Sequence, residues 1–179
     1  MRLHESRQQA RTRGRGAERF IPGLGVATLF LAALSLGPSY AHVLEAGPRL
    51  AIWSPELWRE TTVFNGQFEY FAVVGAPVDL AAIVFTVLLA FLLHGRRPSV
   101  ALALVGAALF IAALAAWFIL VAPMNAVLAL WAAGPLPADF EAVRHRWEIG
   151  HMVVAALKAF GFLFVSAALL LPQRLRRDT

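Results

Sequence analysis

The chain has 179 residues, of which 59% are hydrophobic and only 15% are charged, and its formal net charge is +5. Soluble domains carry a charge on about a quarter of their residues, so the composition excludes an ordinary water-soluble domain. The basic residues form short blocks beside long apolar runs, which indicates a membrane protein and disfavours binding to nucleic acid. Cysteine is absent, which excludes disulfides, thiolate metal sites and cysteine nucleophiles.

An arginine-rich segment, residues 1–19, opens the chain, and we expect a disordered cytoplasmic tail whose arginines contact anionic lipid headgroups. An apolar run without Asp, Glu, Lys or Arg follows, from about residue 21 to residue 43. Its length favours a membrane anchor that is retained. Small residues at Ser39 and Ala41 also fit a signal peptide cleaved after Ala41, which would leave three spans and begin the chain at His42.

Three more apolar runs follow, at about residues 68–93, 100–122 and 149–171. Each reaches the length of roughly 20 residues that a helix needs to cross a bilayer. They are continuous and rich in Ala and Leu, which predicts helices and not the alternating strands of a barrel. We therefore predict an all-α, integral membrane four-helix bundle in a single domain, residues 20–172, followed by a basic cytoplasmic tail, residues 173–179.

The distribution of basic residues predicts the orientation of the bundle. Of the 16 Lys and Arg residues, 11 lie before the first span, between the second and third spans, or after the fourth. The positive-inside rule therefore places both termini in the cytoplasm, in the inner membrane of the cell. Four of the five tryptophans lie on the opposite, outer side, where indole rings favour the membrane interface.

The two outer segments, residues 44–67 and 123–148, are too long to be simple turns. Ser54 followed by Pro55 is typical of the start of a helix, with a hydroxyl at the N-cap and proline at the first helical position. The second segment has an amphipathic run, starting near Phe140, that leads into the fourth span. We expect both segments to form short interfacial helices that cover the outer end of the bundle, and we expect the function there.

Two charged residues interrupt the apolar spans, Asp79 in the second and Lys158 in the fourth. Each lies ten residues beyond a glutamate at the outer end of its span, Glu69 and Glu148, so about 15 Å of helix rise brings both to the same depth. An unpaired charge in the membrane is costly, so we predict that they pair inside the bundle. A structural pin between two helices and a proton relay or substrate counterion both remain open as interpretations.

Two His/Glu pairs with a spacing of three residues lie at the outer ends of the first and fourth spans. Residues three apart share one helix face, and di-metal carboxylate bundles use such pairs together with glutamates from other helices. A metal ion at this cluster is one hypothesis, and polar residues that simply meet the interface are the other. The candidate metal ligands are His42, Glu45, Glu69, Glu148 and His151.

Two further motifs carry a resemblance to a known family. The third span ends in Ala122-Pro123-Met124-Asn125, and Arg146-Trp147-Glu148-x-x-His151 opens the fourth, with Trp131 between them. This pattern resembles the anthrone-oxygenase-like family of small four-helix membrane proteins, over roughly residues 24–171 and most specifically over 122–151. Fungal members oxidise anthrones to anthraquinones with dioxygen. The resemblance therefore implies a small apolar aromatic substrate at the outer end. The matching residues are Asn125, Arg146, Trp147, Glu148 and His151.

For such an enzyme, His151 and His42 are the expected proton acceptors, because imidazole titrates near neutrality. The carboxylates expected to orient them are Glu148 and Glu69. The expected substrate-binding residues are Arg146, Trp147 and Asn125. The alternative is a non-enzymatic accessory or assembly subunit of a larger membrane complex, while a small transporter is disfavoured because the four spans contain no repeat. The expected partners are the lipid bilayer and either other membrane subunits or a second copy of the chain.

Overall fold

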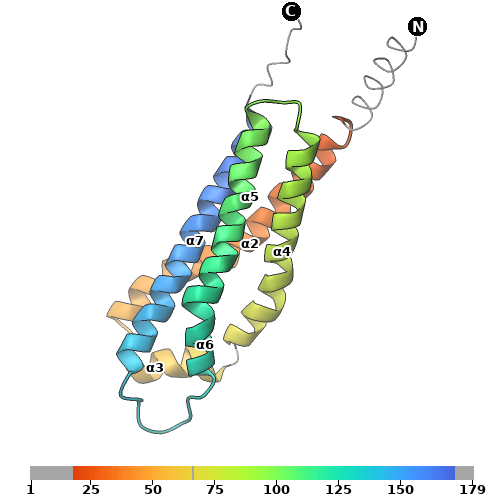
Figure 1. Cartoon of the computed structure of the whole chain (residues 1–179). Coiled ribbons are helices and arrows are strands. Elements are labelled where there is room, and N and C mark those ends of the chain that lie inside the picture. The colour runs from red at the N-terminus through yellow and green to blue at the C-terminus, as the bar shows by residue number, and fades with distance from the viewer. Residues whose placement is uncertain (1–17, 66, 172–179) are drawn as a thin grey trace, which may run out of the picture.

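The computed structural model describes residues 18–65 and 67–171, and within this part every regular element is a helix (Figure 1). The predicted tails, residues 1–19 and 173–179, lie outside it apart from positions 18 and 19. Four long helices run alternately up and down. They are α2 (Ile21–Ala51), α4 (Gln67–Leu92), α5 (Ser99–Ala116) and α7 (Phe140–Leu170). The shorter elements are α3 (Pro55–Arg59), the π-helical turns η1 (Glu60–Phe64) and η2 (Trp117–Val121), and α6 (Ala122–Leu128).

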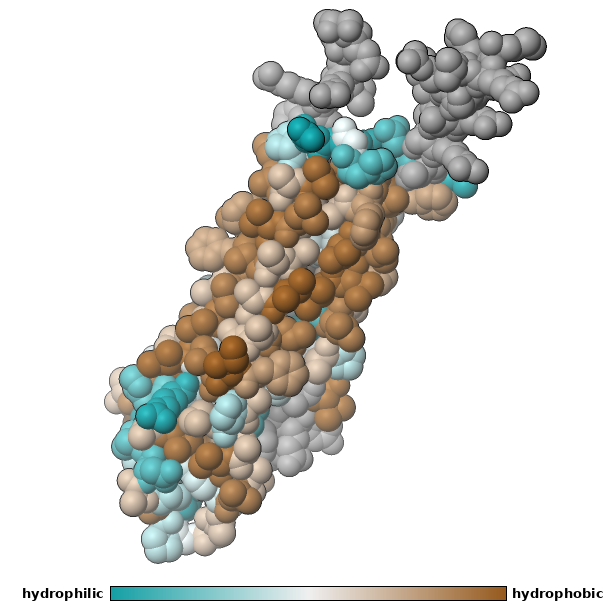
Figure 2. Space-filling model, in the orientation of Figure 1, coloured by the Kyte–Doolittle hydropathy of each residue, from teal (hydrophilic) through white to brown (hydrophobic). Residues whose placement is uncertain are grey.

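The four long helical segments are long and apolar enough to cross a membrane: Ile21–Ala51, Val73–Leu92, Ser99–Leu128 and Phe140–Leu170. Hydrophobic residues cover the middle of the face shown in Figure 2, and hydrophilic residues gather at its two ends. A helical bundle with an apolar waist and polar ends is suited to a bilayer, since each helix satisfies its own backbone hydrogen bonds. The four-helix architecture is confirmed, while the side of the membrane that each end faces stays a prediction.

The two ends of the bundle differ in construction (Figure 1). One end holds the start of α2, the short turn of residues 93–98 and the end of α7, and we call it the basic end. The opposite end holds α3, η1, α6 and the connection of residues 129–139, and we call it the loop end. The predicted outer elaboration therefore corresponds to the loop end.

The helices extend further at the loop end than the apolar runs predict. Span one was expected to end at residue 43, but α2 continues to Ala51, where Arg49 is buried and pairs with Glu45 one turn earlier, 2.8 Å from Nη2 to Oε2. Span three continues through η2 and α6 to Leu128, and the wide π-helical turn accommodates Pro123, which cannot donate a backbone hydrogen bond.

One predicted interfacial helix is present and the other is not. Ser54 caps α3 through a hydrogen bond that its Oγ accepts from the backbone N–H of Leu57 at 3.2 Å, as its sequence context predicts. The amphipathic run of residues 140–148 is instead the first part of α7, so the prediction of a separate helix there is wrong. The physical reason is that its buried face, including Phe140, Val143 and Trp147, continues the helical spacing of the span without interruption.

Close contact between α5 and α7 depends on glycine. A Cβ added at Gly106 would lie 2.6 Å from Cγ2 of Val165 and 3.2 Å from the carbonyl oxygen of Gly161, and one added at Gly161 would lie 3.2 Å from the ring of Phe110. Small residues let transmembrane helices approach closely and gain van der Waals contact. The α5–α7 pair thus forms the tightly packed side of the bundle.

The apolar core is divided into two clusters. The cluster nearer the basic end includes residues from α2, α4, α5 and α7, among them Ala32, Leu89, Phe110 and Val165. The cluster at the loop end is built around Trp58 and Trp147 and contains no buried residue of α2 or α4 among those described. In the loop-end half, α2 and α4 therefore contribute no buried residue to this apolar cluster.

Candidate functional site

A cavity of about 470 Å³ occupies the loop-end half of the bundle, between α2, α4, α5 with η2, and α7. Most of its wall is apolar, and Pro38, Val78, Leu114 and Val154 contribute to it. Small-molecule sites in proteins have this size and this mixture of many apolar and a few polar groups. The polar residues of the wall are Ser35, Ser39, His42, Asp79, Asn125, Trp147, His151 and Lys158.

The two histidines predicted from the sequence lie in contact. The rings of His42 on α2 and His151 on α7 stack with their centroids 4.1 Å apart and an interplanar angle of 23°. Nδ1 of His42 and Nε2 of His151 are buried and make no hydrogen bond within the described part of the chain. Because α2 and α7 run in opposite directions, residues near the end of one and the start of the other meet at the same level.

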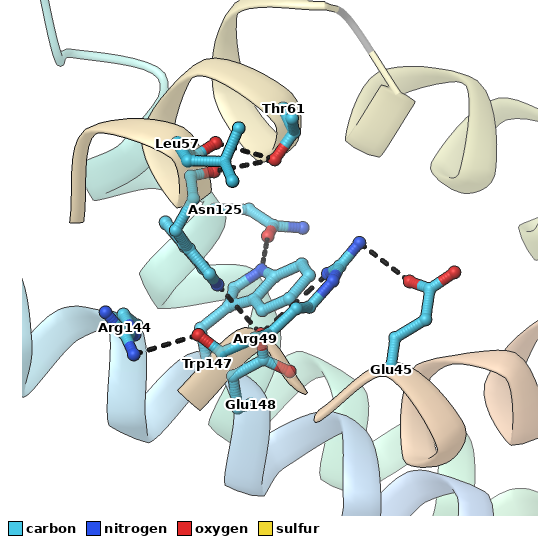
Figure 3. Close-up of polar contacts among 9 residues, drawn as sticks. Glu45, Arg49, Leu57, Thr61, Asn125, Arg144, Trp147 and Glu148 are labelled. Carbon is cyan, nitrogen blue, oxygen red and sulfur yellow. Dashed lines mark hydrogen bonds and ion pairs between the residues drawn. The ribbon is translucent and has the colours of Figure 1, made fainter. Parts of the chain in front are cut away.

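Trp147 covers the histidine pair on its loop-end side. Its ring centroid lies 4.3 Å from that of His151 and 5.3 Å from that of His42. Its Nε1 donates a hydrogen bond of 2.7 Å to Oδ1 of Asn125 on α6, which fixes the orientation of the indole (Figure 3). Gly150 permits this arrangement, since a Cβ there would lie 3.0 Å from Cγ2 of Val121 in η2.

Asp79 and Lys158, the two charges of the spans, form an ion pair on the cavity wall. The Nζ of Lys158 lies 2.8 Å from both carboxylate oxygens of Asp79. Ser35 on α2 donates a hydrogen bond of 2.6 Å to Oδ1 of Asp79. The pair therefore ties α2, α4 and α7 together at the end of the cavity that faces the basic-end core.

The glutamates of the predicted cluster are engaged elsewhere. Glu148 is fully buried, and its Oε1 accepts a hydrogen bond of 2.9 Å from Nε1 of Trp58 on α3. Arg49 lies between the two acids, with Nη1 3.8 Å from Oε1 of Glu148 and Nη2 2.8 Å from Oε2 of Glu45 (Figure 3). Neither glutamate belongs to the cavity wall.

The predicted metal ligands therefore do not converge where they are described. No three His, Asp or Glu side chains of the described residues are placed to hold a metal ion together. The guanidinium of Arg49 attracts the carboxylates of Glu45 and Glu148, while the imidazoles of His42 and His151 stack on each other. The side chain of Glu69, the remaining predicted ligand and catalytic group, lies outside the described residues.

Neither Arg146, the predicted substrate-binding arginine, nor Arg49 belongs to the cavity wall. Arg146 is exposed, whereas Arg49 is 3% exposed and lies over Trp147 at 5.8 Å from its ring centroid. Arg144 is also buried, and its Nη2 donates to the carbonyl oxygens of Arg49 and Leu50 at the end of α2. It thereby satisfies carbonyl groups that the helix end leaves without partners.

A sequence signal for these arginines exists. On α2 the buried polar residues Ser35, His42 and Arg49 are seven apart, and on α7 Arg144, His151 and Lys158 are seven apart. Seven residues make nearly two turns, so each set forms one stripe along its helix, and the two stripes face each other across the bundle. Trp58 has no such signal, because its burial depends on how α3 folds back onto α7.

Comparison with protein-family models, with curated proteins and with solved structures found no match. The fold and the site define a helical bundle suited to a membrane, with a largely apolar cavity that carries a few polar side chains in its loop-end half. The resemblance to the anthrone-oxygenase-like family stays a prediction from the motifs of residues 122–151.

Proposed function

We propose that this protein binds a small, flat, apolar aromatic molecule in the cavity and oxidises it with dioxygen, with His42 and His151 as the proton acceptors. The observation that carries the proposal is the stacked pair of imidazoles in the wall of a largely apolar cavity of about 470 Å³. Imidazole side chains are rare inside an apolar helical bundle, and polar residues at such positions usually serve a function.

The substrate enters from the lipid. Leu34, Val74 and Phe118 line the cavity and are 45%, 64% and 60% exposed, so they connect its wall with the apolar outer surface of the bundle. An apolar molecule concentrates in the bilayer by the hydrophobic effect. This route requires no opening of the covered loop end.

The chemistry needs a base, an oxidant and a fixed ring. An unpaired nitrogen of His42 or His151 removes a proton from a ring CH₂ group, and dioxygen oxidises the carbanion that is left. One oxygen atom becomes a new ring carbonyl, and the other leaves as water with both hydrogens of the CH₂ group. Trp147, fixed by Asn125, offers an aromatic surface that holds the planar substrate next to the histidines.

The test is dioxygen consumption by the purified protein in detergent with anthrone, corrected for the spontaneous reaction. His42→Ala and His151→Ala should each lower the enzymatic rate by about 100-fold, the usual contribution of a general base. The double variant should be little worse than either single variant, because the two residues act as one unit. His145→Ala, an exposed histidine on the same helix, is the matched control and should retain the full rate.

Two outcomes contradict the proposal. A full rate in the His42→Ala/His151→Ala double variant would exclude the histidines as the base. A wild-type protein that does not exceed the spontaneous reaction would favour the accessory-subunit alternative.

A further inference from the structure

The cavity has a second polar position, and together with the histidine pair it defines a substrate class. Resting on the histidine base of the proposed function, we propose that the cavity also takes a flat aromatic diol of the hydroquinone type. Such a diol has no ring CH₂ group, so the histidines accept a hydroxyl proton instead, and dioxygen takes up two electrons and two protons, which gives the quinone and hydrogen peroxide. One hydroxyl lies at His42 and His151, and the hydroxyl on the opposite edge of the ring lies at Asp79. This assigns Asp79 a direct contact with the substrate in addition to its ion pair.

The spacing of the two polar positions supports a molecule with two opposite oxygen atoms. His151 and Lys158 are seven residues apart on α7, and so are Ser35 and His42 on α2, which corresponds to about 10.5 Å of helix rise. Between them on the wall lie the apolar Pro38 and Val154, together with Ser39, whose hydroxyl donates a hydrogen bond of 3.4 Å to the carbonyl oxygen of Ser35. A ring with para hydroxyl groups and a hydrogen bond of about 2.8 Å at each end spans a similar length, about 11 Å.

The hydrogen bonds around Asp79 indicate which chemical group it takes. Its carboxylate has about four acceptor positions. Two receive bonds from Lys158 and one, on Oδ1, receives the Ser35 hydroxyl, so Oδ2 keeps a position open within the described part of the chain. A carboxylate accepts only, so its partner must be a donor such as a hydroxyl, and an ether oxygen cannot replace it.

The exposed fractions of the Asp79 and Lys158 side chains also favour a hydroxyl as the group that is bound. The side chain of Asp79 is 17% exposed and that of Lys158 only 9%, although both line the cavity. Lys158 also directs a hydrogen bond of 3.3 Å to the carbonyl oxygen of Ser35. The ammonium group is therefore occupied by the protein, and the carboxylate is the more available of the two charges. A pin between helices would need neither this exposure nor a place on a cavity wall.

The experiment compares three probes under argon, by equilibrium dialysis against the purified protein in detergent micelles. The probes are 1,4-dihydroxynaphthalene, 4-methoxy-1-naphthol, which has the same shape but lacks the second donor, and 1,3-dihydroxynaphthalene, whose hydroxyls are not opposite. A charge-assisted hydrogen bond to Asp79 should make the first probe bind about tenfold more tightly than either of the others. Empty micelles measure partitioning into detergent.

A variant isolates the Asp79 contact. Asp79→Leu/Lys158→Leu removes both charges together, and in this protein the tenfold preference should disappear while binding of 4-methoxy-1-naphthol persists. Equal affinities in the wild type would overturn the inference, and so would a preference that survives in the double variant. The ranking of the three affinities in the wild-type protein tests the inference even if the double variant fails to fold.

A further variant distinguishes failure of this inference from failure of the proposed function. If His42→Ala/His151→Ala weakens binding of all three probes and the wild type shows no preference among them, only the diol inference fails. If that variant leaves binding of every probe unchanged, both fail. The supporting result is a tenfold preference in the wild type that needs Asp79, together with weaker binding of all probes without the histidines.

Discussion

The two halves of this bundle use the same helices in different ways. Toward the basic end, α2, α4, α5 and α7 all contribute to one apolar cluster. Toward the loop end, the apolar cluster draws on α3, η1, α5, η2, α6 and α7, while α2 and α4 line a cavity with polar residues. The basic-end half is therefore filled by apolar side chains, whereas the loop-end half encloses a cavity with polar side chains in its wall.

The physical difference lies in what fills the space between the helices. In the basic-end half, leucine, alanine and phenylalanine side chains meet glycine-lined contacts and pack densely. In the loop-end half, buried Arg49, Arg144 and Glu148 obtain some of their partners from Trp58, Glu45 and the end of α2. Oε2 of Glu148 and Nε of both arginines make no hydrogen bond within the described part of the chain. Side chains that are held by hydrogen bonds can keep a cavity in shape without filling its centre.

The largest expected effect is at the boundary between the halves, where Asp79 and Lys158 pair. Asp79→Ala or Lys158→Ala should each lower the free energy of unfolding by about 3–5 kcal/mol, because each leaves the other charge inside the bundle without its opposite charge. Asp79→Leu/Lys158→Leu should recover most of the loss. Thermal unfolding of the purified variants in detergent measures this, and a double variant as unstable as the sum of the singles would show that the pair is not coupled.

A smaller loss is expected from the hydrogen bond that fixes α3 over the loop end. Trp58→Phe keeps an aromatic ring in place but leaves Glu148 without its donor, at a cost of about 1–3 kcal/mol in the free energy of unfolding. Trp131→Phe, a half-buried tryptophan of the same cluster, is the control and should cost less. Adding Glu148→Leu to Trp58→Phe should restore stability in the same unfolding assay, and no recovery would argue against the hydrogen bond as the cause.

A substitution that adds one methyl group tests the close contact between α5 and α7. Gly106→Ala should cost about 1–3 kcal/mol, because the new Cβ overlaps Val165 and approaches the backbone of Gly161. Gly37→Ala on α2, where a Cβ would meet nothing within 4 Å, should leave stability unchanged or slightly higher. Equal unfolding temperatures for the two variants would mean that α5 and α7 do not approach as closely as described.

No loss of stability is expected when the two ends are labelled, and this experiment establishes which end faces which side. Gly95→Cys at the basic end and Ala138→Cys at the loop end are both exposed substitutions in a protein that lacks cysteine. The positive-inside rule predicts that only the Ala138→Cys variant reacts with a membrane-impermeant thiol reagent in intact cells. The Gly95→Cys variant should react after permeabilisation, and its labelling from outside would reverse the orientation.

The sequence by itself determined the features that depend on local composition and helical period. Four long apolar runs require four helices, because a chain in lipid must satisfy its own backbone. The start of α3 followed from Ser54 and Pro55, whose side chains act within one turn. The approach of Asp79 to Lys158 also followed, because both lie the same number of residues from the starts of two helices that run in the same direction. His42 approaches His151 because the end of one helix and the start of an antiparallel one lie at the same depth.

Only the tertiary structure decided which side chains of the loop end face inward. Arg144 and Arg146 are two residues apart and therefore point to different sides of α7, and only the packing of α2 against one of these sides buries Arg144 and exposes Arg146. The burial of Arg49 and the Trp58–Glu148 hydrogen bond likewise join segments about 100 and 90 residues apart, respectively. The seven-residue spacing places Arg49 and Arg144 on the same helix faces as the histidines, but no local pattern specifies how α3 and α7 cover the end of α2 and so bury these faces.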